Sequence, residues 1–262
     1  MDIPSTLPSL FLSHGSPLLA LEDSATGRFL DGLGQQLPRP RAILVASAHF
    51  MRREPTVTLS AQPGTVHDFS GFPAELHAMR YPAPGDPALA RRVAALLERT
   101  AITARVDPQA GLDHGVWVPL HRMYPQADIP VVALSVNPHG SAADHYRTGL
   151  ALQPLRSEGV LVIGSGGFSH NLRALDWQHP HAPASPAVER FTTALRDHLL
   201  RGDVDAALEW HSLSDALTNH PSSEHLYPLY VALGAAGQQA RARTLHRAVE
   251  FGALALDAFA FE

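Results

Sequence analysis

Four apolar runs alternate with helix-like segments along this chain of 262 residues, and this alternation restricts the possible folds more than any other feature. The apolar runs cover residues 8–13, 41–47, 129–136 and 159–165. Helix-like segments with start or stop residues cover residues 86–100 and 185–202, and shorter helical patterns cover residues 141–155 and 224–237. Short buried strands that alternate with helices are typical of parallel sheets covered on both faces. The sequence therefore predicts an α/β fold with a mostly parallel central sheet flanked by helices.

The composition argues against several classes of function. The formal net charge is −5 and no dense run of Lys or Arg occurs, so we expect binding neither to nucleic acid nor to a membrane surface. No apolar run is long enough to cross a bilayer, and the N-terminal MDIPSTLPSLF lacks the basic flank and the longer apolar core of a secretory signal. A cytoplasmic protein is expected. Because the chain has no Cys, any metal ion must bind to His and carboxylate side chains.

The 22 Pro and 19 Gly are dispersed among the connections, and no repeat or composition shift marks a boundary. We therefore expect one domain over residues 1–262, either as a monomer or in a small homo-oligomer. Residues 60–85 form the longest irregular region. Irregular segments of this length in a compact domain are commonly lids or binding loops.

Histidine follows three of the four apolar runs: His14 in LFLSHGSP, His49 in ILVASAHF and His170 in VLVIGSGGFSH. Ligands of parallel sheets bind at the carboxyl ends of the strands, so these three side chains are expected to meet in one crevice. Neutral imidazoles held by rigid elements suit a metal ion. Each His could instead end its strand with a hydrogen bond to a backbone carbonyl. Three such strand ends in one chain favour a metal site at the C-terminal ends of the strands.

Two further potential ligands, Glu224 and His225, lie in NHPSSEHLYPL near the C-terminus. Ser222 or Ser223 can cap a helix whose first turn contains both residues. The same pattern also fits a capped helix without a metal, in which Glu224 interacts with the helix dipole.

Aromatic residues accompany two other histidines. His114 and Trp117 in GLDHGVWVPL suit an aromatic substrate pocket with a proton carrier, or a capped turn that buries Trp117 in the core. His67 and Phe72 in HDFSGFP suit a lid with aromatic contacts, or a packed Ω-loop. GSGGFS lacks the Gly-Lys-Ser/Thr ending of a phosphate-binding loop. Seven histidines in helical or loop patterns are expected to be solvated: His77, His121, His139, His145, His198, His211 and His246.

The motifs SHGSP, SAHF, DHGVWVPL, GSGGFSHNL and HPSSEHLYPL together resemble those of the class III extradiol ring-cleaving dioxygenases, and specifically of the 4,5-DOPA extradiol dioxygenase branch. Their order and approximate spacing agree over residues 9–237. The resemblance implies that His14, His49 and His225 hold a divalent metal ion. It implies that His170 is a further ligand or an acid/base, and that His114 contacts the substrate and assists proton transfer. Because the wider superfamily often uses glutamate as the third ligand, Glu224 is the alternative to His225.

The implied activity of this one catalytic domain is the opening of a catechol ring, in DOPA or a related catecholic acid, with O2. The product would be a semialdehyde acid. The resemblance implies Fe(2+) for turnover, while Zn(2+) also suits a His-rich centre and occurs in family members. Two other functions remain open at this point. One is zinc-dependent hydrolysis with His170 or Glu224 activating water, and the other is non-catalytic metal or ligand binding on the same fold.

Overall fold

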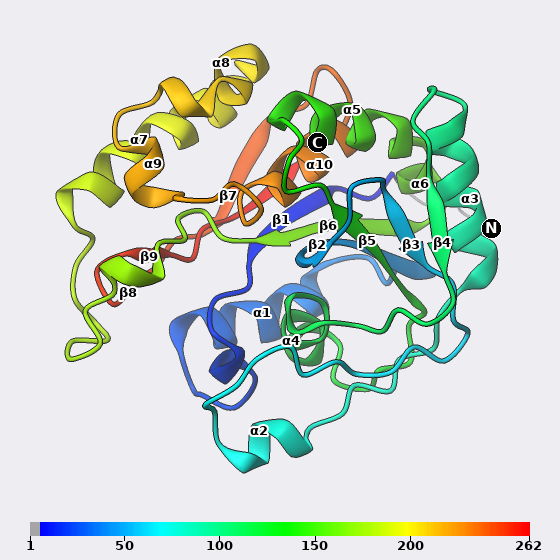
Figure 1. Cartoon of the computed structure of the whole chain (residues 1–262), viewed down its shortest axis with the longest axis horizontal. Coiled ribbons are helices and arrows are strands. Elements are labelled where there is room, and N and C mark those ends of the chain that lie inside the picture. Colours follow the sequence, from blue (N-terminus) through cyan, green and yellow to red (C-terminus); the bar gives the residue numbers. More distant parts are fainter. Residues whose placement is uncertain (1–5) are drawn as a thin grey trace.

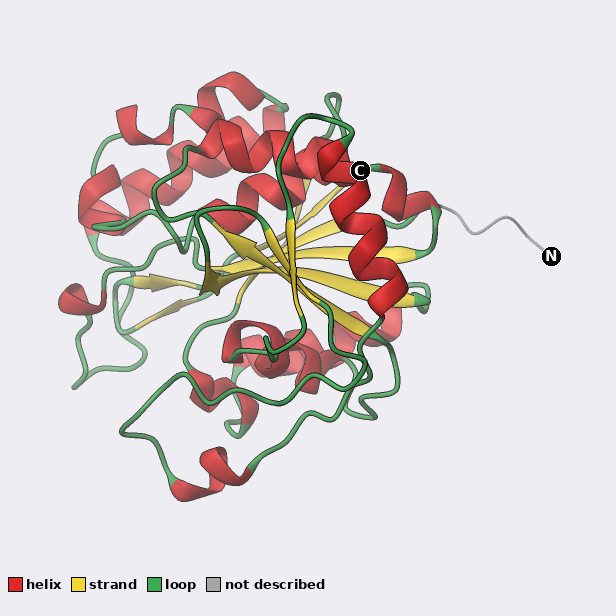
Figure 2. Ribbon diagram, turned by 45° about the vertical axis from the view of Figure 1, so that its right-hand side comes forward, coloured by secondary structure: helices red, strands yellow, loops and turns green. Residues whose placement is uncertain are grey.

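An eight-stranded sheet lies at the centre of the structure, and helices cover both of its faces (Figures 1 and 2). The structure is a computed structural model that describes residues 6–262. Residues 1–5, the first part of the segment on which the prediction about a secretory signal depends, lie outside the described residues. Among the residues described, no helix combines the length and apolar character needed to span a membrane.

The four predicted strands are confirmed, and they are neighbours at the centre of the sheet. They are β1 (Ser9–Ser13), β2 (Ala42–Met51), β5 (Val131–Val136) and β6 (Val160–Gly166). Adjacent strands in the order β5-β2-β6-β1 are all parallel. Every residue of β1, β5 and β6 is buried, which explains why these strands read as continuous apolar runs. The predicted α/β fold with a mostly parallel central sheet is confirmed.

The strands at the two edges of the sheet were not predicted. They are β3 (Thr56–Thr58), β4 (Arg105–Asp107), β7 (Ala242–His246) and β10 (Ala258–Phe261). β3 and β10 pair antiparallel with β5 and β1, respectively. Segments of three to five residues contain too few alternations to define a strand period. A separate two-stranded sheet joins β8 (Val249–Glu250) to β9 (Leu254–Ala255).

Alternate residues of β2 point to opposite faces of the sheet and enter different cores. Ile43 and Val45 pack with α1 (Ala25–Gln36) and α4 (His114–Met123). Leu44, on the other face, packs with α3 (Pro87–Glu98), α5 (Ala142–Leu152) and α10 (Tyr227–Ala235). The remaining helices are α2 (Ala74–Ala78), α6 (Pro154–Ser157), α7 (Pro186–Arg201), α8 (Val204–Leu208) and α9 (Ala216–Asn219). Three short 3₁₀ segments span Pro17–Ala20, Leu172–Ala174 and Trp210–Ser212.

The predicted helix ends are confirmed for α3 and α7. Asp86 and Ser185 occupy the N-cap positions, and their side chains accept hydrogen bonds from Leu89 N and Val188 N. Helix α7 ends at Gly202, whose φ of 71° is a conformation that glycine adopts at little cost.

The predicted helix start near Ser222 is wrong, because α10 begins at Tyr227 and therefore follows Glu224 and His225. No side chain caps this helix. The Ser222 hydroxyl donates to Glu224 Oε1 at 3.0 Å and does not accept from a backbone N–H. Glu224 and His225 consequently lie in a turn that leads into the helix.

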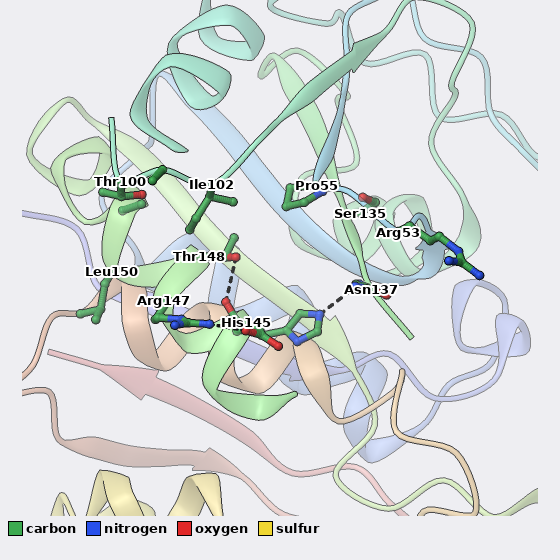
Figure 3. Close-up of a pocket in the computed structure, with 13 residues that line it drawn as sticks. Arg53, Pro55, Thr100, Ile102, Ser135, Asn137, His145, Arg147, Thr148 and Leu150 are labelled. Carbon is green, nitrogen blue, oxygen red and sulfur yellow. Dashed lines mark hydrogen bonds and ion pairs between the residues drawn. The ribbon is translucent and has the colours of Figure 1, made fainter. Parts of the chain in front are cut away.

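The expectation that His145 is solvated is also wrong. His145 is 4% exposed and its ring stacks on Tyr227 at a centroid distance of 4.2 Å. Its Nδ1 donates to Ser141 O at 2.7 Å, and its Nε2 accepts from Asn137 N at 3.0 Å. His145 is one of the residues that line a cavity of about 590 Å³. Figure 3 shows its side chain among the other lining residues. Because both ring nitrogens are used in the neutral form, protonation would break the bond from Asn137, and burial lowers the pKa of His145 to about 4.

This burial makes the free energy of unfolding depend on pH. The pKa of His145 in the folded protein lies below the ordinary value of 6.5, so the unfolded chain binds the proton more readily. The stabilising contribution is complete above pH 6.5 and is lost as the pH falls toward 4. From pH 7 to pH 5 the wild type should lose about 2 kcal/mol more stability than His145→Gln in urea unfolding. Equal losses of unfolding free energy in the two proteins would contradict a lowered pKa of His145 in the folded state.

Candidate metal centre

Three imidazoles from distant parts of the chain meet at the C-terminal ends of the parallel strands. His14 directly follows β1, His49 lies near the end of β2, and His225 lies in the turn before α10. The Nε2 atoms of His14 and His49 are 3.1 Å apart, and those of His49 and His225 are 3.2 Å apart. His14 and His225 are buried, and His49 is partly buried. The structure thus brings together the three histidines expected to form a ligand set.

The second ring nitrogen of each of these histidines has its own hydrogen-bond acceptor. Nδ1 of His14 lies 3.0 Å from Ser165 Oγ, and this hydroxyl donates its proton to Gly115 O. Nδ1 of His49 lies 3.2 Å from Asp68 Oδ2. Nδ1 of His225 lies 2.9 Å from Glu224 Oε1. All three acceptors require a proton on Nδ1, so in the neutral form of each ring the Nε2 atom carries the lone pair.

Three lone pairs that face one another at this distance fit a metal cation. Two nitrogens bound at about 2.0–2.1 Å to one ion are about 2.9 Å apart at a right angle and about 3.4 Å apart at the tetrahedral angle. The two observed distances fall between these limits. Burial, followed by the charges of the neighbouring histidines, holds the pKa of His14 and of His225 well below the ordinary value. The rings are therefore neutral, which is the form that binds a metal ion.

Two further histidines adjoin these three. The His114 ring, at the first residue of α4, lies 3.9 Å from the His49 ring and 5.3 Å from the His14 ring. His170 follows β6, and its ring stacks on His225 at 3.4 Å with an interplanar angle of 5°. Burial lowers the pKa of His170 to about 4, so this ring is also neutral near neutral pH.

The residues predicted to contact an aromatic substrate lie in two different environments, the 60–85 loop and the buried core. Phe72 packs against Phe69 at 5.3 Å, and Phe69 in turn lies 5.7 Å from the His114 ring. His67 is part of the same segment, and its Nε2 lies 3.0 Å from Met79 O. Trp117 is fully buried and its Nε1 donates to Val66 O at 3.0 Å. Because no surface of Trp117 is exposed for a substrate, we assign Trp117 to the core and not to the substrate pocket. Its hydrogen bond to Val66 attaches the 60–85 loop to α4.

Glycines explain how His225 reaches the sheet. A Cβ on Gly164 would lie 2.0 Å from Pro228 O, and one on Gly166 would lie 2.1 Å from His225 O. Gly167 N also donates to His225 O at 2.9 Å. The glycines of GSGGFS therefore let the turn before α10 contact the end of β6, a close backbone approach and not a phosphate-binding loop.

Asp68, Ser165 and Asp113 were not among the predicted site residues. Asp113 is buried and accepts from Ser47 Oγ at 2.6 Å, and burial raises the pKa of its carboxyl to about 6. Asp68 stands beside His67 in HDFSGFP, and Ser165 stands within GSGGFS. The rule that a metal-binding His donates its other nitrogen to an acceptor would have directed the search to such residues. Their pairing with particular histidines depends on the fold.

Removal of the Ser165 hydroxyl should weaken metal binding with little change in shape. Ser165→Ala leaves His14 Nδ1 without its acceptor, and such losses typically reduce metal affinity 10–100-fold, roughly. Ser169→Ala is the matched control, because its hydroxyl is equally buried but donates to Ala253 O, accepts from Ala255 N and is hydrogen-bonded to no histidine. Competition with a chelator for Zn(2+) measures both variants. Equal affinities of Ser165→Ala and the control would show that this hydroxyl does not set the orientation of His14.

Comparison with known proteins gives a consistent result. A family model described as the catalytic LigB subunit of aromatic ring-opening dioxygenase matches residues 8–254. Two proteins named 4,5-DOPA dioxygenase extradiol match nearly the whole chain. The one from Beta vulgaris is 38% identical and the match covers 97% of this chain and 96% of the relative. The one from Escherichia coli K12 is 41% identical and the match covers 95% and 93%.

A solved structure shows the same fold. The crystal structure of an uncharacterized protein from Escherichia coli K12 has a TM-score of 0.83 and 36% sequence identity, and the match covers 97% of this chain and 99% of that chain. The matched range, residues 8–254, contains all five histidine motifs of this chain. Aromatic ring-opening dioxygenases are oxidoreductases that use a metal ion, a small aromatic substrate and O2, and the match extends this description to the present chain. The chain therefore belongs to the LigB family of aromatic ring-opening dioxygenases.

Proposed function

We propose that this chain, as one catalytic domain, is an extradiol dioxygenase that opens a catechol ring, in DOPA or a related catecholic acid, with O2. The observation that carries the proposal is the close approach of the Nε2 atoms of His14, His49 and His225, with the rings of His114 and His170 beside them. The names of the relatives support the catechol class. Addition of both oxygen atoms of O2 to the ring gives the semialdehyde acid without any external reductant.

His14, His49 and His225 are the proposed metal ligands. Glu224 accepts the hydrogen bond from His225 Nδ1. We therefore propose that Glu224 orients His225, and that His225 is the third ligand. Fe(2+) is the proposed ion for turnover, and Zn(2+) fits the same nitrogen set in isolated protein. When bound there, the ion would act as a Lewis acid and hold the two reactants next to each other.

His114 and His170 are the proposed acid/base residues. Both rings adjoin the proposed ligands: His114 contacts His49, and His170 contacts His225. A neutral imidazole can accept a proton from a catechol hydroxyl and return it to a later oxygen anion. His114 Nδ1 is bonded to Asp68, so its Nε2 is the nitrogen available for this exchange.

The aromatic ring of the substrate is proposed to bind beside the segment that carries His67, Phe69 and Phe72. The Phe69 ring meets the His114 ring edge-on at an angle of 81° and links this segment to the proposed acid/base. Edge-to-face contacts of this kind suit a planar catechol ring. We propose that Phe72 and His67 complete this part of the pocket and influence which catechol side chain is accepted.

Oxygen uptake with a panel of catechols tests the proposed function. Protein loaded with Fe(2+) under nitrogen, then mixed with DOPA or another catechol and air, should consume one O2 per catechol and form a yellow ring-opened product. His14→Ala should lose at least about 100-fold in rate, because a ligand is removed. His139→Ala, which replaces an exposed loop His, is the control.

Failure of every catechol to consume O2 while Fe(2+) is demonstrably bound would contradict the proposed activity. Cleavage of an ester by the Zn(2+) form without O2 would support the hydrolase alternative instead. Retention of both metal and activity by His14→Ala would show that the centre lies elsewhere.

A further inference from the structure

Asp68 contacts two of the five clustered histidines at once. Its Oδ2 accepts from His114 Nδ1 at 3.0 Å and from His49 Nδ1 at 3.2 Å. Its Oδ1 accepts from the backbone N–H of His114 at 2.9 Å. The Asp68 side chain is 24% exposed and the His114 side chain is 6% exposed. One carboxylate therefore bridges a proposed metal ligand and a proposed acid/base residue.

The segment around Asp68 is fixed to the helix that carries His114. Val66 N donates to Leu112 O at 2.8 Å, and Trp117 Nε1 donates to Val66 O at 3.0 Å. Trp117 lies about one turn after His114 on α4, so the loop is attached both before the helix and along it. On the other side of the loop, His67 Nε2 lies 3.0 Å from Met79 O. These contacts hold the carboxylate at a defined place and make reorientation costly.

The chemistry of a carboxylate determines what it does to both rings. An ionised carboxylate only accepts hydrogen bonds, so each facing imidazole must carry its proton on Nδ1. The Nε2 of His49 is then free for a metal ion, and the Nε2 of His114 is free for proton exchange with the substrate. Without this acceptor, either ring can carry its proton on Nε2 or rotate about its side-chain torsion.

We propose that Asp68 is a positioning residue that fixes the ring tautomer and orientation of His49 and His114 together, and so couples metal binding to proton transfer. The proposal rests on the proposed function for the roles of these two histidines. It assigns the 60–85 loop a task beyond covering the substrate, because the loop supplies the group that prepares the centre.

Asp68→Asn is the sharpest test, because it keeps the size of the side chain and removes acceptor capacity. An amide has one acceptor oxygen and one donor NH2, but three N–H groups point at this side chain. If the NH2 faces the two rings, both must move their protons to Nε2. If it faces the backbone of His114, two donors oppose each other and the helix start is disturbed.

Two readouts besides activity decide the outcome. In Zn(2+)-loaded protein, two-bond ¹H–¹⁵N spectra of the imidazoles report which ring nitrogen carries each proton. We expect Nδ1–H for His49 and His114 in the wild type, and loss of this form for His114 in Asp68→Asn. We also expect Zn(2+) affinity to fall about 10-fold or more. In the Fe(2+) enzyme, kcat should fall about 10–100-fold while KM for the catechol changes by less than about threefold.

Glu75→Gln is the matched control, because it removes an exposed carboxylate from the same loop region and should leave all three measurements unchanged. A loss of thermal stability in Asp68→Asn, with unchanged tautomers, Zn(2+) affinity and kcat, would overturn the proposal and reduce Asp68 to a cap of α4. If no catechol is turned over even by the wild type, the proposed function fails, but the tautomer and Zn(2+) measurements still decide the role of Asp68.

Discussion

The arrangement of this protein depends on the mutual approach of three imidazoles, His14, His49 and His225, whose Nε2 atoms lie 3.1 and 3.2 Å apart. Lone pairs held this close repel unless a cation lies between them, and burial removes the water that would otherwise relieve them. Hydrogen bonds at the opposite ring nitrogens, the Nδ1 atoms, offset this repulsion. Each Nδ1 is bonded to a different acceptor, a hydroxyl or a carboxylate, which keeps the three rings in place.

The parallel sheet provides the geometry for this approach. The end of β6 lies between β1 and β2, so the histidines of all three strands reach the same edge. The fourth contribution, His225, arrives from the other end of the chain because Gly164 and Gly166 have no side chains to keep α10 away. Figure 1 shows β1, β2, β6 and α10 close together at this place, although they span more than 200 residues of sequence.

The sequence predicted the parts of this structure whose signals are local. The four central strands are buried on both faces, so their apolar runs stood out, and His14 and His49 were placed correctly at strand ends. The turn at His225 was wrongly predicted as a helix start from the two serines before it. In the structure the Ser222 hydroxyl binds Glu224 Oε1 and does not cap a backbone N–H. Asp68 is 46 residues away from His114, and no local pattern shows which carboxylate reaches an imidazole over such a separation.

The central claim is that three histidine nitrogens, with no carboxylate of Glu224, bind the metal ion. X-ray absorption spectra of the Fe(2+)-loaded wild type and Glu224→Gln test it most directly. The account predicts three imidazole nitrogens at about 2.0–2.2 Å in both proteins, with only a small change in their distances in the variant. Loss of an oxygen ligand in Glu224→Gln, together with only two imidazoles in the wild type, would contradict it.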